Sequence, residues 1–127
     1  MNKVFLMGRL TKDVEVKYTP QQMAVARVSV ALDRGKDKNG QDRGADFPSC
    51  VAFGRTAENL ERFSGKGLRI AVEGHLQTGN YEKNGIKHYT TDVIVDRLEF
   101  IDWKNKESAE TEPAYEGFEE VNEDIPF

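Results

Sequence analysis

Aromatic and basic side chains occur close together at two places in this 127-residue chain. Phe47 and Phe53 fall on one face of a predicted strand, with Arg55 just beyond it, and Tyr81 is followed at short spacing by two lysines. Flat rings can stack on unpaired bases, while Lys and Arg follow the phosphates; stacking contributes roughly 1–3 kcal/mol per base in characterised single-strand binders. The pattern therefore predicts contacts with an unpaired nucleic acid strand, although Phe47 and Phe53 fit a barrel core about equally well.

Residues that could perform catalysis or hold a metal form no recognisable pattern. The two histidines, His75 and His88, have no metal-ligand spacing with each other or with nearby acids. Cys50 alternates with Val51 in a strand pattern, which predicts a small core residue and not a nucleophile. The glycines are scattered and form neither a phosphate-binding loop nor a dinucleotide fingerprint. We therefore expect no enzyme activity, no metal and no cofactor.

Charge is divided unevenly along the chain. Residues 1–104 carry 17 Lys and Arg against 14 Asp and Glu, a net charge of +3, whereas residues 105–127 carry one Lys and eight acids, a net charge of −7. A basic body with an acidic end is typical of nucleic-acid binding, with the end serving as an interaction arm. A solubilising tail is the alternative, but a terminal Phe127 lowers solubility when it is exposed.

Length and composition fit one small domain with an appendage. The single Cys50 excludes an intramolecular disulfide, and the first ten residues do not form an export signal, so we expect a reducing, cytoplasmic setting. No stretch approaches the ~18 apolar residues of a membrane span, and we expect no membrane association.

Strands dominate the elements that must position these residues. Gly8 interrupts the first strand, where we expect a bulge or bend, and Pro48 indicates an edge or a bulge in the third. Residues 24–32 alternate strictly between two faces, as a half-buried strand does. Five strands are predicted. The first lies at residues 3–10 and continues at residues 15–18 after a turn, and the others lie at residues 24–32, 46–53, 68–77 and 86–101.

One helix and two hairpins complete the pattern. The helix is expected to begin with Thr56 as its N-cap and to end before Gly65. A long basic hairpin is predicted at residues 33–45 and a second hairpin loop at residues 78–85, since each contains an Asn-Gly turn signal.

The order of these elements is typical of an OB-fold. Three strands, a short helix and two further strands form a five-stranded Greek-key barrel of the all-β class, with the helix between strands 3 and 4. Apolar periodicity stops after the last strand. We therefore expect an OB-fold domain over residues 1–103 and a disordered acidic tail over residues 104–127.

Several short motifs occur in a fixed order. They are Asn2-Lys3-Val4, Gly8-Arg9-Leu10, Asp13-x-Glu15-Val16-Lys17-Tyr18, Phe53-Gly54-Arg55 before Ala57-Glu58, Glu73-Gly74-x-Leu76-x-Thr78, Tyr89-Thr90-Thr91-Asp92-Val93 and the final Asp124-Ile125-Pro126-Phe127. Each is weak alone, but their order and spacing together resemble the bacterial-type single-stranded DNA-binding protein (SSB) family. The resemblance covers roughly residues 2–102 and the last six residues.

The resemblance implies a homotetramer that binds and protects single-stranded DNA, without strong sequence specificity, during replication, recombination and repair. It implies a cytoplasmic, nucleoid-associated location and stacking by Phe47, Phe53 and Tyr81. The basic residues expected at the DNA, from the resemblance or from the pattern of rings and cations, are Lys3, Lys17, Arg34, Lys36, Lys38, Arg55, Lys66, Lys83 and Lys87. The residues implied to recruit partner proteins at the acidic tip are Glu123, Asp124, Ile125, Pro126 and Phe127.

The chain departs from the family pattern in ways that predict weaker stacking and fewer ion pairs per subunit. The first hairpin has no aromatic residue, Gly79-Asn80 replaces a common basic pair, and Pro48-Ser49 stands where polar or basic residues are common. Alternatives remain open: a protein-interaction adaptor whose barrel is only a scaffold, an RNA or primosome-type binder, and, most distantly, a hydrolase. An adaptor has no reason to expose Phe47, Phe53 and Tyr81.

Overall fold

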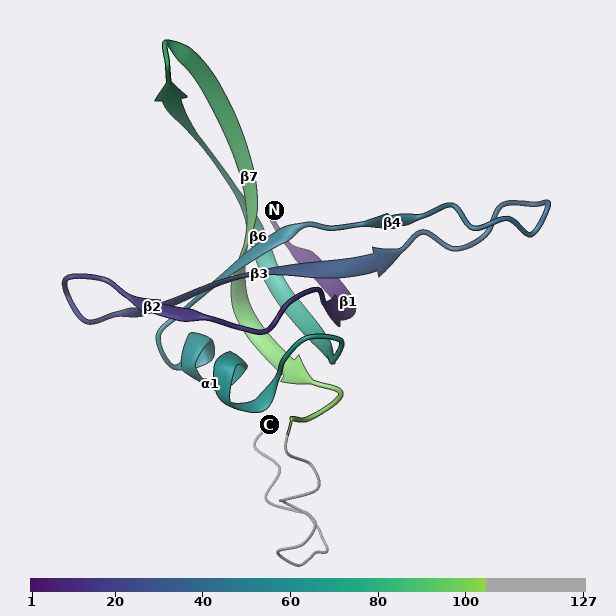
Figure 1. Ribbon diagram of the computed structural model, residues 1–127, viewed down its shortest axis with the longest axis horizontal. Coiled ribbons are helices and arrows are strands. Elements are labelled where there is room, and N and C mark those ends of the chain that lie inside the picture. Colours follow the sequence, from purple (N-terminus) through teal and green to yellow (C-terminus); the bar gives the residue numbers. More distant parts are fainter. Residues whose placement is uncertain (105–127) are drawn as a thin grey trace, which may run out of the picture.

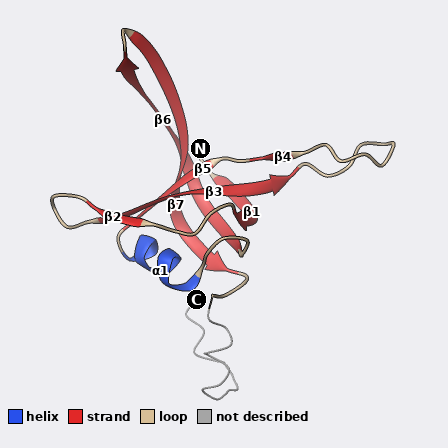
Figure 2. Ribbon diagram, in the orientation of Figure 1, coloured by secondary structure: helices blue, strands red, loops and turns tan. Residues whose placement is uncertain are grey.

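Backbone pairing joins all the strands of the described part of the chain into one sheet that closes on itself (Figures 1 and 2). The computed structural model describes residues 1–104; the predicted partner-binding residues, Glu123 to Phe127, lie outside the described residues. The elements are β1 (Val4–Leu10), β2 (Val16–Tyr18), β3 (Ala24–Asp33), β4 (Ala45–Asp46), β5 (Ser49–Phe53), α1 (Arg55–Phe63), β6 (Arg69–Lys83) and β7 (Ile86–Phe100).

The strand order confirms the predicted OB-fold. The sheet runs β1-β6-β7-β5-β3-β2, and β1 returns to pair with β3 through Arg9↔Ala31 and Leu10↔Val30, which closes the barrel. Among the strands of residues 1–104, only β5 and β7 run parallel, with Cys50 opposite Val93. The five long strands form the barrel, while the short β2 and β4 extend it beside β3.

Alternation along β3 decides which side chains enter the core. Ala24, Ala26, Val28 and Val30 are buried, and the residues between them face outward, as their period of two predicts. The helix α1 covers one end of the barrel and buries Ala57 and Leu60 against this core.

Two glycines lie where strands of the barrel approach each other most closely. A Cβ atom at Gly8 would lie 2.3 Å from the carbonyl oxygen of Ala31, and one at Gly74 would lie 2.2 Å from that of Ile94. The bulge expected at Gly8 is not there, because β1 and β6 stay in register through Gly8↔Ile70. The irregularity lies instead between Glu73 and Gly74, in the β6–β7 ladder. Gly8 is therefore required for close packing and not for a break in pairing.

The helix begins two residues earlier than expected. Gly54, with φ 64°, is the N-cap, and no side chain caps the helix, so the expected role of Thr56 is wrong. The strand ends at Phe53 and the helix starts at Arg55, which leaves one connecting residue. Its positive φ is available to Gly and disfavoured for Thr. The predicted end is confirmed, since α1 stops at Phe63.

The second hairpin differs most from its prediction. Residues 78–83 are not a loop, because β6 and β7 remain paired as far as Lys83↔Ile86. We call the outer part of this pair, residues 77–92, the ribbon; it projects from the barrel in Figure 1. Apart from Ile86, its side chains are mostly polar on both faces, so the hydrophobic alternation that reveals a half-buried strand is missing. The predicted Asn84-Gly85 turn is confirmed, with φ values of 55° and 78°.

An ion pair joins the start of β6 to the segment that follows β7, at one end of the barrel. The Arg69 guanidinium donates to both carboxylate oxygens of Asp102, at 2.9 and 3.0 Å, and the backbone N–H of Arg69 donates to the same carboxylate. These contacts, chiefly the side-chain hydrogen bond, lower the pKa of Asp102 to about 2. Trp103 packs beside it against Phe63 and Phe100.

Replacing Gly74 by alanine tests the close strand contact. We expect Gly74→Ala to lower the free energy of unfolding by about 3 kcal/mol, because the new methyl group meets a backbone carbonyl that cannot rotate away. Gly79→Ala in the same strand is the control, since its methyl group would meet only the Thr90 hydroxyl, at 3.3 Å. Urea denaturation at fixed protein concentration measures both variants. Equal midpoints for the two variants would contradict this reading of Gly74.

Candidate nucleic-acid interface

Three neighbouring strands bring a cation and an aromatic ring into one outward-facing row. Lys17 of β2 lies opposite Val25 of β3, and Val25 lies opposite Phe53 of β5. Residues opposite each other in a ladder project to the same side of the sheet. The Lys17 ammonium group and the Phe53 ring therefore share the outer surface of the barrel.

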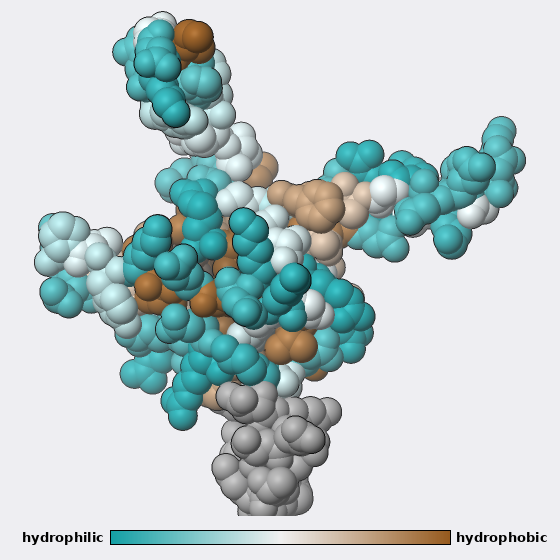
Figure 3. Space-filling model, viewed as in Figure 1, coloured by the Kyte–Doolittle hydropathy of each residue, from teal (hydrophilic) through white to brown (hydrophobic). Residues whose placement is uncertain are grey.

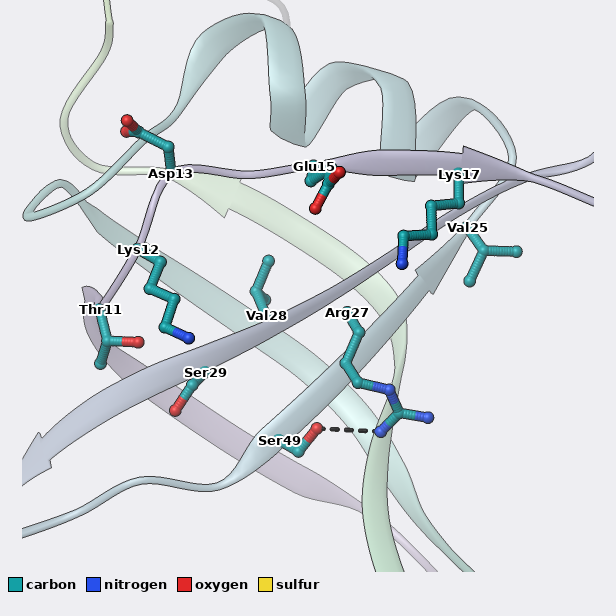
Figure 4. A pocket seen from close by; sticks show the side chains of 10 residues that line it. All are labelled: Thr11, Lys12, Asp13, Glu15, Lys17, Val25, Arg27, Val28, Ser29 and Ser49. Atoms are coloured by element: carbon teal, nitrogen blue, oxygen red, sulfur yellow. Dashed lines mark hydrogen bonds between the residues drawn. The ribbon is translucent and has the colours of Figure 1, made fainter.

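A groove with a volume of about 520 Å³ runs along this surface (Figure 4). Figure 4 shows the ammonium groups of Lys12 and Lys17 directed into the groove from opposite ends, with Glu15 between them. Asp13 turns away and accepts a hydrogen bond from the backbone N–H of Lys66, at 2.9 Å. The groove is lined by Thr11, Lys12, Asp13, Glu15, Lys17, Val25, Arg27, Val28, Ser29 and Ser49.

Arg27 occupies the middle of the interface and carries its own counter-ion. Its guanidinium donates to Asp92 of β7 at 2.8 Å and to the Ser49 hydroxyl at 3.1 Å. The Arg27 side chain is 63% exposed whereas that of Asp92 is 18% exposed, so the guanidinium is open to a second anion. The sequence prediction missed Arg27 and Lys12. Arg27 is an exposed residue of the alternating strand at residues 24–32, so the alternation together with its charge could have identified it.

All three predicted stacking residues have exposed rings. Phe47 is 61%, Phe53 is 43% and Tyr81 is 52% exposed. The alternative that Phe47 and Phe53 form barrel core is therefore wrong. Phe53 is the exposed last residue of β5, after the buried run Cys50, Val51 and Ala52, and Phe47 precedes that strand. Burial, and to a smaller extent the Asp92 carboxylate, raise the pKa of the Cys50 thiol to about 11, which fits the predicted core role.

The basic side chains of the first hairpin are partly matched by its acids. Arg34 donates to Asp46 at 2.9 Å, which lowers the pKa of that carboxyl group. Lys36 lies opposite Asp42 in an isolated bridge. Lys38 is exposed next to the turn, where Asp37 accepts two backbone hydrogen bonds. Figure 3 shows the first hairpin and the ribbon as mostly hydrophilic surfaces.

The ribbon separates residues that are close in sequence. Tyr81 lies opposite His88 and Lys83 lies opposite Ile86, so these four share one face. Lys87 lies on the other face, directly opposite Glu82. Of the two predicted lysines, only Lys83 is therefore brought onto the face of Tyr81.

The other predicted cations have different settings. Lys3 pairs with Glu73 at 3.3 Å, and Glu73 lines a second groove with Phe5 and Met7 on another part of the barrel. Arg55 is exposed at the first residue of α1, two positions after Phe53. The predicted set therefore does not form one continuous cluster.

The described residues contain neither a cluster of metal ligands nor a membrane-spanning helix. Within residues 1–104, no three or more His, Cys, Asp or Glu side chains are grouped as a metal ion would require. The helix in the same part of the chain is too short and too polar to cross a membrane.

Comparison with known proteins agrees with this geometry. A single-stranded DNA-binding protein of Clostridium tetani is 39% identical and is aligned over 98% of this chain and 93% of its own length. Single-stranded DNA-binding protein 1 of Streptococcus pyogenes is also 39% identical, over 100% of this chain and 99% of its own. A single-stranded DNA-binding protein of Clostridium perfringens is 46% identical over 83% of this chain. The model of the single-strand binding protein family matches residues 1–101, and the chain therefore belongs to that family.

Proposed function

We propose that this protein is a binder of single-stranded DNA, without strong sequence specificity, and not an enzyme. The observation that carries the proposal is the row in which Lys17 and Phe53 share one outward face of the barrel. The names of the relatives agree with it. The exposed rings of Phe47, Phe53 and Tyr81 also favour nucleic-acid binding over a pure scaffold role, because a scaffold has no reason to expose them.

Base stacking and phosphate contacts explain both the affinity and the low specificity. Every base has a flat face, so Phe47, Phe53 and Tyr81 can accept any of the four. Lys12 and Lys17 meet phosphates, which carry no sequence information. Arg27 can exchange part of its contact with Asp92 for a phosphate, because its side chain is largely exposed. Each phosphate neutralised releases counter-ions, so affinity falls with salt at a slope of about −0.7 per contact.

Fluorescence anisotropy of labelled oligo-dT against a duplex of matched length tests the proposal. We expect tight, salt-sensitive binding of the single strand alone. Phe53→Ala is expected to weaken binding by roughly 1–3 kcal/mol, about five- to 150-fold, because one stacking surface is lost.

Two variants at the same position separate the role of the ring from simple bulk. Phe53→Trp keeps an aromatic face and should bind as the parent does, whereas Phe53→Leu keeps apolar bulk and should bind as weakly as Phe53→Ala. Equal binding of single strand and duplex by the parent protein would overturn the proposal. Preference for an RNA oligomer of equal length would favour the RNA-binder alternative.

We infer that the functional unit is a homotetramer. Phe5 and Met7, 71% and 65% exposed, project from the outer face of β1 beside the second groove, where large apolar side chains are left uncovered in a single chain. A net charge of +3 on residues 1–104 is small for a phosphate binder, and four copies on one strand would supply four times as much.

Native mass spectrometry tests the oligomeric state. We expect a mass of four times the 14.4 kDa chain. Met7→Glu should shift the protein to smaller species, because it places a charge within the apolar surface. Tyr89→Glu, at an exposed position on the ribbon, is the control and should leave the mass unchanged. A monomeric parent protein would contradict the inference.

We further propose that the acidic tip recruits proteins of replication, recombination and repair, in the cytoplasm and at the nucleoid. The terminal carboxylate and Asp124 would meet a basic rim on the partner, and Phe127 would enter an apolar pocket. The net charge of −7 on residues 105–127 supports a second role, in which this segment competes weakly with DNA for the basic groove.

Deleting residues 105–127 tests the competition. We expect the shortened chain to bind oligo-dT several-fold more tightly at low salt and equally at high salt, because screening removes the effect of the charge. Anisotropy titrations at both salt concentrations measure it. Unchanged affinity at low salt would refute the competition, and unchanged capture of replication proteins on an affinity column would refute recruitment.

A further inference from the structure

The ribbon carries a preformed stack of two rings. Tyr81 and His88 are directly opposite in the β6–β7 ladder, with ring centroids 5.0 Å apart and planes inclined by 17°. One face of the Tyr81 ring is therefore covered by the imidazole. The other face is left for a further ring, and Tyr81 remains 52% exposed.

The two faces of the ribbon differ in charge around this stack. Because side chains alternate, the face of Tyr81 and His88 also carries Lys83, and the ladder places no acid on it between residues 79 and 90. Its residues are Gly79, Tyr81, Lys83, Ile86, His88 and Thr90. The opposite face carries Glu82 directly across from Lys87, and its charges balance.

We propose that His88 belongs to the nucleic-acid site, as a positioning residue for Tyr81 and, when protonated, as a phosphate contact; the inference rests on the proposed function. The imidazole holds the Tyr81 ring so that a base stacks on its free face. The same imidazole lies on the ribbon face that carries Lys83, and between residues 79 and 90 a second cation would meet no carboxylate on that face. From β6 this face carries Tyr81 and Lys83, and from β7 it carries Asp92, which accepts a hydrogen bond from Arg27.

A pH dependence follows from this placement. Histidine is the side chain whose charge ordinarily changes between pH 5 and 8. A protonated His88 adds one positive charge to the stacking face, so affinity for single-stranded DNA should rise as the pH falls. His75 provides an internal comparison, because it pairs with Asp96 at 2.9 Å and lies at the root of the ribbon, outside residues 77–92.

The test measures the dissociation constant for labelled oligo-dT between pH 5.5 and 8 at fixed ionic strength; thymine does not titrate in this range. The parent protein is expected to bind three- to tenfold more tightly at pH 5.5 than at pH 8, with a salt slope steeper by about 0.7. His88→Gln should flatten the profile. His75→Gln is the matched control, because it removes the other histidine, and it should keep the profile of the parent.

Two more variants test the positioning role, with binding measured at pH 8. His88→Phe keeps a ring behind Tyr81 and should bind as the parent does, whereas His88→Ala should bind several-fold more weakly. Equal affinities of these two variants would overturn the positioning role. A pH profile that survives in His88→Gln would overturn the phosphate contact. Both results differ from failure of the proposed function, in which the parent protein does not bind oligo-dT at any pH.

Discussion

Barrel closure depends on the close backbone contact between strands at Gly8 and Gly74. At each of these positions a side chain would collide with a carbonyl oxygen of a neighbouring strand. The first contact lets β1 lie against β3 just before the two strands pair, and the second tightens the ladder from which the ribbon extends. A narrow barrel of this kind accommodates mostly small core residues, such as Ala24, Ala26 and Cys50. Closure then fixes which residues of each strand face outward.

The outward residues form an interface in which acidic side chains partly neutralise the basic ones. Arg27 is paired with Asp92 and Arg34 with Asp46, while Glu15 stands between the two lysines of the groove. Exposed ion pairs of this kind contribute little to stability, so their members remain available to other charges. We expect such an interface to gain its affinity for DNA from the exposed rings and from exchange of protein carboxylates for phosphates. A fixed excess of positive charge contributes less.

Much of the fold could be predicted from local patterns. The period of two in β3 requires one buried face, and Asn84-Gly85 supplies the positive φ values of a two-residue turn. The ribbon could not be recognised as strand, because neither of its faces is buried and the hydrophobic signal is absent. The start of α1 was misplaced since the tight connection at Gly54, and not a capping side chain, determines it.

The sequence by itself determined the order of the main elements, the alternation of buried and exposed residues along β3 and the separation of a basic body from an acidic end. Only the tertiary structure decided which side chains meet. Lys17 and Phe53 are 36 positions apart, yet they share a row because β3 pairs with both β2 and β5. Lys83 and Lys87 are near neighbours in the chain, yet the turn between them places them on opposite faces. Contact across a sheet follows from register, and register depends on pairings between segments that are distant in the sequence.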